Sequence, residues 1–178
     1  MATRLVKLRG IAYYPKVFEV NRDLKGYQDA LVDVGGQTTI DLDLDDRHME
    51  LLKRSGTMSR GNTSPDNPDL TRVKFKRKWQ EQYGGGEPKV VHADDTPWNV
   101  TTDKYIGNGS EVEVTISVYD TKRKGIVGTR LDQVKVLNLV PYEGSSVEVM
   151  SVDDLDSPAP APKAPAPKPQ MVDDEIPF

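Results

Sequence analysis

The stretch Glu111-Val-Glu-Val-Thr-Ile-Ser-Val-Tyr119 decides the class of fold, because its side chains alternate strictly between polar and apolar. Successive side chains of a strand point to opposite faces, so this period of two predicts a strand with one buried face. The polar run 120–125 predicts a turn, and 126–140 predicts a last strand region. This part of the chain is therefore expected to be β-structure.

Further strand patterns and one helix pattern surround this segment. The stretch Arg4–Tyr14 interleaves polar and apolar residues and is expected to end as a strand at Pro15. A helix is predicted over 45–54, with Met49 and Leu52 on its buried side. The other predicted strands cover 27–34, 38–44, 72–79 and 89–93. About six strands, one short helix and long loops favour a mainly all-β fold, a small barrel or a sandwich.

The composition narrows the class of protein. The chain has 178 residues, 36% of them hydrophobic and 29% charged, and it contains no cysteine and only two histidines. A disulfide framework, a thiolate metal site and a thiol nucleophile are thereby excluded, and a histidine-based triad or zinc site is poorly supplied. No apolar stretch approaches the roughly 18 residues of a membrane span. We expect a soluble cytoplasmic binding protein that is not an enzyme and needs no cofactor.

The segment 72–79, Arg-Val-Lys-Phe-Lys-Arg-Lys-Trp, combines cations with aromatic rings. Single-stranded nucleic acid needs cations for its phosphates and flat rings for its unstacked bases. An alternative interpretation is that the apolar residues belong to the core and the lysines form a solvated face. On a strand, one face carries Arg72, Lys74, Lys76 and Lys78, and the other carries Val73, Phe75, Arg77 and Trp79. The expected phosphate contacts are Arg72, Lys74, Lys76, Arg77 and Lys78, and the expected stacking residues include Phe75, Trp79 and Tyr83.

Two other aromatic positions are candidates for base stacking. Tyr13 and Tyr14 are consecutive at a strand end, so they are expected to point to opposite faces and to leave one ring exposed, next to Lys16. Trp98 lies in a polar turn, where an aromatic ring is harder to bury. We therefore add Tyr14, Lys16 and Trp98 to the candidate nucleic-acid contacts, with ordinary core and surface packing as the alternative.

The acidic residues between 41 and 46 could suggest a metal cluster, and Gly84-Gly85-Gly86 could suggest a phosphate loop. Strand alternation followed by a helix N-terminus explains the acids, because acidic side chains are favoured at that end of a helix. No Lys-Ser or Lys-Thr follows the glycines, as a phosphate-binding loop would require. The sequence therefore predicts no metal site and no nucleotide-binding loop.

The C-terminal segment differs from the rest of the chain. Residues 151–178 carry six acids against two lysines, so the formal net charge of −4 lies there and residues 1–150 are neutral as a whole. A Pro/Ala-rich spacer could extend roughly 40 Å, because such sequences adopt a stretched conformation. The chain then ends Asp173-Asp174-Glu175-Ile176-Pro177-Phe178. An acidic run followed by apolar residues suits an apolar pocket with a basic rim, and the alternative is a plain solubilising tail.

This ending resembles the C-terminal tip of bacterial single-stranded DNA-binding proteins, with Glu175 where a third Asp is usual. The rest of the chain does not resemble the bacterial core domain. It resembles phage-encoded single-stranded DNA-binding proteins with the OB fold and acidic, Phe-ended tails. That resemblance covers most of residues 10–140. It rests on the segments Tyr14-Pro-Lys-Val-Phe18, Pro88–Asp94, Tyr105–Val112, Val118–Asp120 and Lys124–Val136.

The resemblance implies an OB-type five-stranded barrel over 1–145, a flexible linker over 146–170 and a partner-binding tip over 171–178. It implies sequence-nonspecific binding of single-stranded DNA in phage replication, recombination or repair, inside the bacterial host cell. Through Asp173, Asp174, Glu175, Ile176, Pro177 and Phe178, the tip would bind host or phage replication and repair proteins and would compete with DNA for the basic groove. The alternative functions are an RNA-binding or annealing module and a protein-interaction adaptor whose barrel is structural. A second copy of the chain, in a homodimer, is a further candidate partner.

Overall fold

The structure is a computed structural model that describes residues 3–80 and 85–142. Contacts divide the chain into two units, Met1–Glu143 and Gly144–Phe178, and every described residue belongs to the first unit. The predicted stacking residue Tyr83, the linker and the acidic tip lie outside the described residues. Their roles stay predictions.

The described residues are mainly β-structure. Nine strands are present in this part of the chain, together with two short α-helices and three 3-10 turns. The strands are β1 (Arg4–Lys16), β2 (Gln37–Leu44), β3 (Gly61–Thr63), β4 (Thr71–Lys78), β5 (Lys89–His92), β6 (Tyr105–Ile106), β7 (Glu111–Asp120), β8 (Val127–Asn138) and β9 (Pro141–Tyr142). The helical segments are α1 (Asp46–Arg54), α2 (Val100–Asp103), η1 (Glu19–Asn21), η2 (Tyr27–Asp29) and η3 (Val32–Val34).

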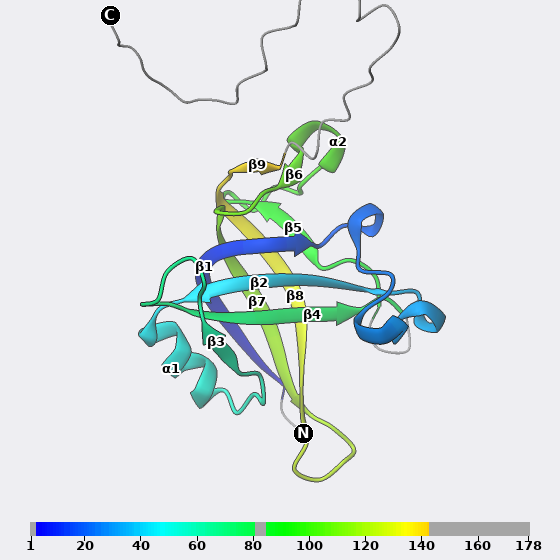
Figure 1. The fold of residues 1–178 in the computed structure, drawn as a ribbon, viewed down its shortest axis with the longest axis vertical. Helices are drawn as coiled ribbons and strands as arrows, with labels where there is room; N and C mark the ends of the chain where they lie inside the picture. The colour runs from blue at the N-terminus through cyan, green and yellow to red at the C-terminus, as the bar shows by residue number, and fades with distance from the viewer. Residues whose placement is uncertain (1–2, 81–84, 143–178) are drawn as a thin grey trace, which may run out of the picture. The chain divides into compact units, whose positions relative to one another are not determined.

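Seven strands form one sheet in the order β3-β4-β2-β1-β7-β8-β5, and β6 pairs separately with β9. The five long strands β4, β2, β1, β7 and β8 are antiparallel neighbours, and the sheet curls until β4 lies against β8 (Figure 1). Among the described residues, no backbone ladder joins these two strands. The result is a partly open five-stranded barrel of the OB type, which confirms the predicted class. Strand β5 confirms the strand predicted over 89–93, and β3 lies in a segment that was predicted as a loop.

Strand β1 belongs to both sides of the barrel. Residues 4–11 pair with β7, and the pairing with β2 begins at Ile11. The change of partner occurs next to Gly10, where an added Cβ atom would lie 2.3 Å from the carbonyl oxygen of Asp43. Only glycine fits so close a backbone approach, so Gly10 allows one strand to serve both halves of the sheet.

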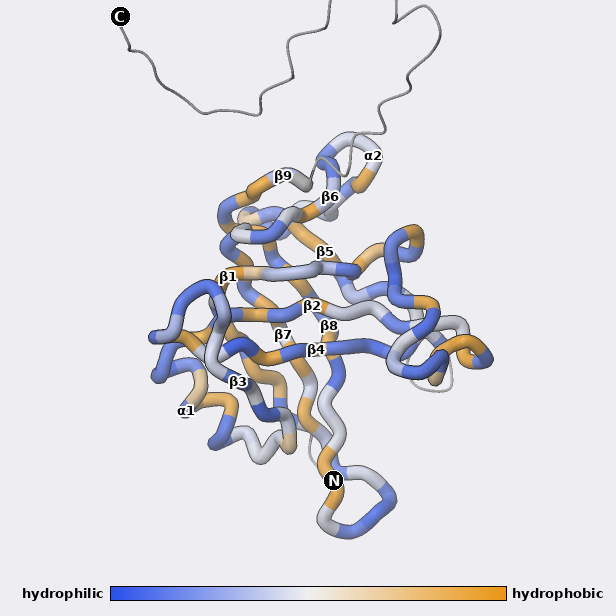
Figure 2. Tube along the Cα trace, in the orientation of Figure 1, coloured by the Kyte–Doolittle hydropathy of each residue, from blue (hydrophilic) through white to orange (hydrophobic). Residues whose placement is uncertain are grey.

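The inward faces of the strands form one hydrophobic core. The predicted alternation in 111–119 is confirmed, since Val112, Val114, Ile116 and Val118 are each 0% exposed. Helix α1 contributes Leu52 to the same core, as its pattern predicted. The turn between β7 and β8 is hydrophilic and extends away from it (Figure 2). No helix in the described residues is long and apolar enough to cross a membrane.

The structure corrects one predicted strand and the predicted end of another. The strand expected over 27–34 is wrong, because this segment forms the 3-10 turns η2 and η3. Gly26, Gly35 and Gly36 have positive φ angles around it, and Tyr27 is 82% exposed, so the apolar residues there have no sheet to face. Strand β1 also continues through Pro15 to Lys16, although Pro15 was expected to end it.

Candidate nucleic-acid interface

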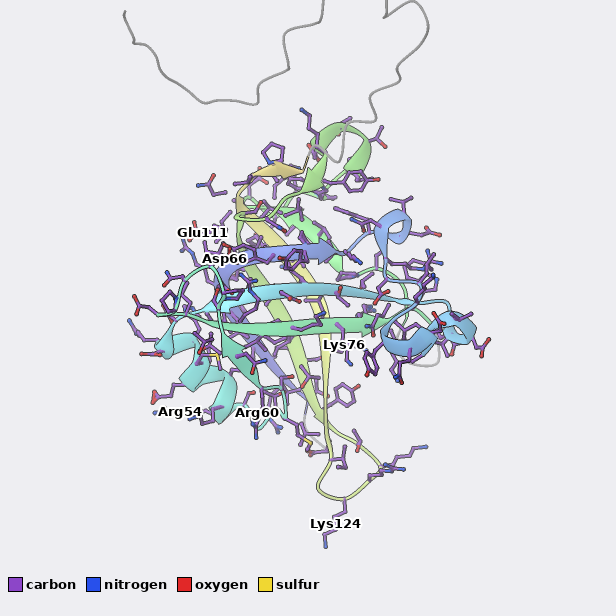
Figure 3. The ribbon with its side chains drawn as sticks, viewed as in Figure 1. Arg54, Arg60, Asp66, Lys76, Glu111 and Lys124 are labelled. Atoms are coloured by element: carbon purple, nitrogen blue, oxygen red, sulfur yellow. The ribbon has the colours of Figure 1, made fainter. Side chains whose placement is uncertain are left out.

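The outer face of β1, β2 and β4 is the candidate interface. The alternation predicted for β4 is confirmed, because Lys74, Lys76 and Lys78 are exposed and Val73 and Phe75 are buried. Figure 3 labels Lys76 on this face and Lys124 at the distant tip of the β7–β8 turn. Written from β1 through β2 to β4, the neighbouring groups are Ile11–Asp43–Arg72, Tyr13–Asp41–Lys74 and Lys16–Thr39–Lys76, with Gln37 opposite Lys78.

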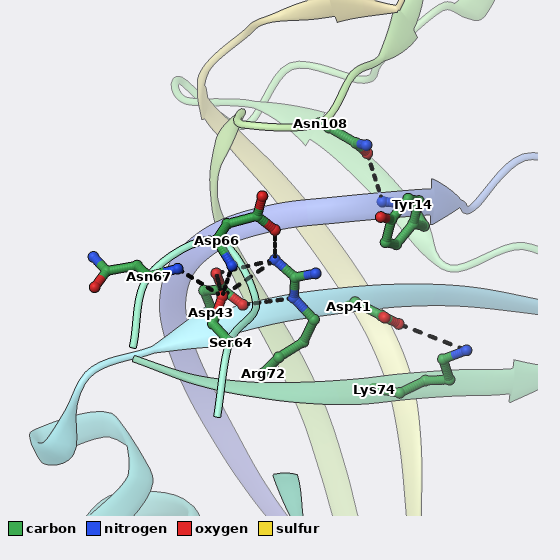
Figure 4. Close-up of polar contacts among 9 residues, drawn as sticks. All are labelled: Tyr14, Asp41, Asp43, Ser64, Asp66, Asn67, Arg72, Lys74 and Asn108. Carbon is green, nitrogen blue, oxygen red and sulfur yellow. Dashed lines mark hydrogen bonds and ion pairs between the residues drawn. The ribbon is translucent and has the colours of Figure 1, made fainter. Parts of the chain in front are cut away.

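Arg72 is the centre of a partly buried ion network (Figure 4). Its Nε donates to Asp43 Oδ1 at 2.8 Å, and its terminal nitrogen donates to Asp66 Oδ2 at 2.6 Å. The Ser64 hydroxyl donates to Asp43 Oδ2 at 2.5 Å and accepts the backbone N–H groups of Asp66 and Asn67. The network therefore fixes the loop before β4 to the sheet.

The charge of Arg72 is balanced within this network. Its side chain is 10% exposed and that of Asp43 is 1% exposed. Hydrogen bonds to Asp43 are the main cause that raises the pKa of Arg72. Two carboxylates face one guanidinium, so Arg72 adds little net positive charge to the face. Its contact with phosphate stays a prediction, whereas its structural role follows directly from the contacts.

Tyr13 and Tyr14 lie on the same side of the sheet, which contradicts the expectation that they point to opposite faces. The register of β1 and β2 shifts between Tyr13 and Lys16, and Tyr14 has a φ of 49°. This β-bulge re-aims the second ring, so the two ring centroids are 6.3 Å apart. The guanidinium of Arg72 lies 3.9 Å from the Tyr13 centroid and 5.9 Å from the Tyr14 centroid.

Lys74 is also opposed by an acid. Its Nζ lies 3.8 Å from Asp41 Oδ1, at the edge of ion-pair distance. Burial is the main cause that raises the pKa of Asp41, and the positive charge of Lys74 partly offsets it. Burial is likewise the main cause that raises the pKa of Tyr13, and the charges of Asp66 and Asp43 add to it. This part of the face, from Arg72 to Lys74, is therefore charge-balanced, and we call it the paired half.

The other part of the face has neutral residues on β2. Lys16 and Lys76 both neighbour Thr39, and Lys78 lies opposite Gln37. Within residues 3–80 and 85–142, neither Lys16 nor Lys76 has a salt bridge. We call Lys16 and Lys76 the open half of the face, and Lys78 follows Lys76 on the same side of β4. Anionic phosphates would gain most from these cations, because no protein carboxylate in the described structure competes for Lys16 or Lys76.

Two predicted contacts do not belong to this face. Phe75 is 1% exposed and lies in the core, so the prediction that it stacks on a base is wrong. Arg77 points to the opposite side of β4, and its side chain is 16% exposed. It donates to the carbonyl oxygens of Gly85 and Leu131 and pairs with Asp132 at 3.1 Å. Burial lowers the pKa of Arg77, and nearby Arg130 adds to the effect.

The two tryptophans lie outside the open half. Trp79 follows β4, and the guanidinium of Arg22 lies 4.3 Å from its ring centroid, which covers one ring face. Trp98 donates from Nε1 to the carbonyl oxygen of Lys104, and its ring centroid lies 4.5 Å from that of His92. Base stacking by Trp79 and Trp98 stays a prediction. On Trp79, a base would have to stack on the ring face opposite Arg22.

Three of the acidic residues between 41 and 46 make ion pairs or a helix cap within the protein. Asp41 and Asp43 face the cations of β4, and Asp45 caps α1 by accepting the backbone N–H of His48 at 2.9 Å. That backbone hydrogen bond is the main cause that lowers the pKa of Asp45. In the part of the chain that the structure describes, no group of three or more His, Cys, Asp or Glu residues could hold a metal ion.

Sequence reasoning missed three residues near Lys16. Asn21, Tyr105 and Asn108 line a pocket of about 370 Å³ together with Tyr14 and Lys16. Tyr105 lies about 90 residues from Tyr14 in the chain, and only the fold brings the two rings to one pocket. The sole local signal was a run of Gly, Asn and Ser at 107–110, which is typical of a loop that approaches another segment closely.

The barrel is similar in fold to solved structures of single-stranded DNA-binding proteins from bacteriophages. No protein-family model and no curated protein sequence matches the chain. The single-stranded DNA-binding protein of bacteriophage Enc34 in complex with ssDNA has a TM-score of 0.54 at 12% identity, over 79% of this chain and 89% of that one. Gp2.5, a single-stranded DNA-binding protein encoded by bacteriophage T7, has a TM-score of 0.53 at 16% identity, over 84% of this chain and 100% of that one. The resemblance expected from the sequence is thus confirmed as a resemblance of fold.

Proposed function

We propose that this protein binds single-stranded DNA without strong sequence preference and coats it during phage DNA replication, recombination or repair. The observation that carries the proposal is the open half of the face. There Lys16 and Lys76 flank a neutral Thr39 on an OB-type barrel, whereas acids balance the cations of the paired half. The similar fold of the Enc34 and T7 proteins supports the same conclusion.

The mechanism is occupancy rather than catalysis. The backbone of the strand would cross β4, β2 and β1 over Lys78, Lys76 and Lys16, and counterion release would supply much of the affinity. Exposed rings would stack on bases, which tolerates any sequence because every base has a flat face. No cofactor enters this mechanism. The protein would act in the cytoplasm of the bacterial host.

A titration of fluorescently labelled single-stranded DNA tests the proposal. We expect tight binding to an oligonucleotide of about 16 residues, an affinity that falls steeply as salt rises, and much weaker binding to duplex DNA of the same length. Fluorescence anisotropy at several salt concentrations measures all three. Equal binding of duplex DNA would contradict the proposal, and preferred binding of RNA would favour an RNA-binding module instead.

The C-terminal tip is proposed to recruit replication and repair proteins and to compete with DNA for the barrel. Removal of residues 171–178 takes away three acids, so single-stranded DNA should bind more tightly at low salt, by about threefold or more. The difference should disappear at high salt, because screening weakens attraction between separated charges. Anisotropy of the full and truncated chains measures it. Equal affinities at low salt would exclude the competition while leaving recruitment to be tested by partner binding.

A further inference from the structure

The pocket beside Lys16 has the composition of a binding site for one flat, polar ligand. It lies at the end of β1 and is lined by Tyr14, Pro15, Lys16, Asn21, Tyr105, Ile106 and Asn108. Ile106 is buried and forms its apolar floor, and Tyr105 packs edge-on against Phe18 with centroids 5.8 Å apart. Its volume of about 370 Å³ and its two tyrosine rings suit an aromatic group rather than a phosphate.

Tyr14 is held at the rim of this pocket at a conformational cost. A φ of 49° is uncommon for a residue that is not glycine, because it lies in the left-handed region that strains an L side chain. The backbone N–H of Tyr14 donates to Asn108 Oδ1 at 2.6 Å, which stabilises the bulge. The ring is nevertheless 57% exposed, so core packing does not account for its placement. Strain that leaves an aromatic ring open at a pocket is typical of a ligand site.

The polar groups of the pocket present donors. Asn108 Oδ1 accepts the N–H of Tyr14, and Asn21 Oδ1 accepts the N–H of Phe18 at 3.0 Å. A backbone N–H must face the amide oxygen, so these bonds fix both amide groups and leave their NH₂ sides as donors. Among the described residues, neither NH₂ group has a partner. In residues 3–80 and 85–142 the ammonium of Lys16 likewise has no acceptor, so it is a further donor.

We propose that this pocket binds one base of the bound single strand and prefers a base that carries carbonyl oxygens, thymine above all, to adenine. Thymine offers two carbonyl acceptors in its ring plane, whereas adenine has no carbonyl oxygen and places an NH₂ donor on its edge. Two amide NH₂ groups could each meet a carbonyl oxygen on thymine, whereas on adenine the NH₂ donor lies between the ring acceptors N1 and N7 and opposes one of the two amide donors. The proposal rests on the proposed function and assigns a base-binding position to it.

The position of Lys16 connects this pocket to the cationic face. Lys16 lines the pocket and also neighbours Thr39, which lies next to Lys76. A strand whose phosphates follow Lys76 and Lys16 would therefore reach the pocket with its next base. Tyr14 at the rim could then stack on that base, a contact worth about 5-fold or more in affinity.

The test uses oligonucleotides of about 12 abasic residues that carry a central thymine, a central adenine or no base. Abasic neighbours remove the self-stacking of adenine, so any difference comes from the one base. With the full chain we expect thymine to raise affinity about fivefold over the fully abasic strand, and adenine to raise it clearly less. Tyr14→Ala should remove both increments, as anisotropy would show.

Asn108→Asp is the sharper variant, because it keeps an oxygen for the N–H of Tyr14 and replaces only the NH₂ donor. Its added negative charge lowers the affinity for the phosphates of all three oligonucleotides alike. The ratio of the affinities for the thymine and adenine oligonucleotides therefore reports on the pocket. The advantage of thymine over adenine should vanish, while the thermal midpoint stays unchanged. Equal increments for thymine and adenine in the unchanged protein, or an intact thymine advantage in Asn108→Asp, would overturn the proposal.

Failure of the pocket and failure of the proposed function give different results. If oligo-dT binds with a steep salt dependence but the single base adds nothing, the pocket is not a base site and DNA binding stands. If neither oligo-dT nor the abasic strand binds at low salt, DNA binding fails and the pocket proposal fails with it. Oligo-dT is therefore titrated beside the three abasic strands.

Discussion

Replacement of Asp43 by alanine is expected to lower the free energy of unfolding by about 3 kcal/mol, because it removes a buried acceptor and leaves the Nε donor of Arg72 and the hydroxyl of Ser64 without that partner. Asp43 is 1% exposed and receives two hydrogen bonds from Arg72 and one from Ser64. Among the described residues, the variant would leave Arg72 with Asp66 as its one carboxylate partner, and it would remove the acceptor that ties Ser64 and its loop to β2. Urea unfolding followed by circular dichroism measures the loss, which corresponds to a fall of roughly 6–12 °C in Tm.

Asp41→Asn is the matched control, two residues away on the same face of β2. Burial raises the pKa of Asp41, so its ionised form is disfavoured by folding. A carboxyl group with a raised folded pKa stabilises the protein below that pKa, and this contribution is lost as pH rises through it. Asp41→Asn should therefore be neutral or slightly stabilising at pH 7. An equal loss of stability in both variants would contradict the special role of the Arg72 network.

Reversal of two charges in the open half, Lys16→Glu with Lys76→Glu, is expected to weaken binding of single-stranded DNA by about tenfold or more at low salt. Loss of two phosphate contacts should also reduce the slope of log K against log salt by about 1.4, since each contact contributes about 0.7 on a single strand. Both lysines are exposed, so the fold should be retained. Anisotropy titrations over a range of salt concentrations measure the affinity and the slope.

The control for this pair is Lys7→Glu with Lys53→Glu. Lys7 lies on the half of β1 that pairs with β7, and Lys53 lies on α1. Both are exposed, and neither has a salt bridge in residues 3–80 and 85–142, so the control changes the net charge by the same amount. If the two double variants lose affinity equally, the effect is one of net charge, and the open half is not the binding face.

Local patterns predicted the long strands of the barrel, although the strand expected over 27–34 was wrong, and long-range contacts decided the site. The alternation in 111–119 predicted the four apolar side chains of β7 that enter the core, because that information lies within nine residues, but it did not predict that Ser117 is buried too. The same reasoning placed Phe75 on the apolar face of β4 but could not show that this face is the closed core rather than a stacking surface. Whether a ring faces the core or the solvent depends on the curl of the whole sheet.

Charge balance on the face could not be predicted either. The sequence shows four cations on one side of β4, but it does not show that Asp43 and Asp41 lie beside the first two and Thr39 and Gln37 beside the others. That difference arises from the register of β2 against β4. The bulge that turns Tyr14 toward Tyr13 also depends on pairing, since one extra residue in β1 reverses the direction of the ring.

The seam between β4 and β8 gives the barrel an adjustable edge. Strand β4 is paired on both edges at 71–73, by β2 and β3, but at 75–78 it is paired with β2 alone. On the other edge, the bonds of Arg77 to Leu131, Gly85 and Asp132 stand in for a ladder. In the described residues, the barrel is thus open along the β4–β8 seam, and the side chain of Arg77 connects the two strands there. A change in the curvature of the stretch that carries Lys76 and Lys78 would therefore break no backbone ladder between β4 and β8 in the described residues.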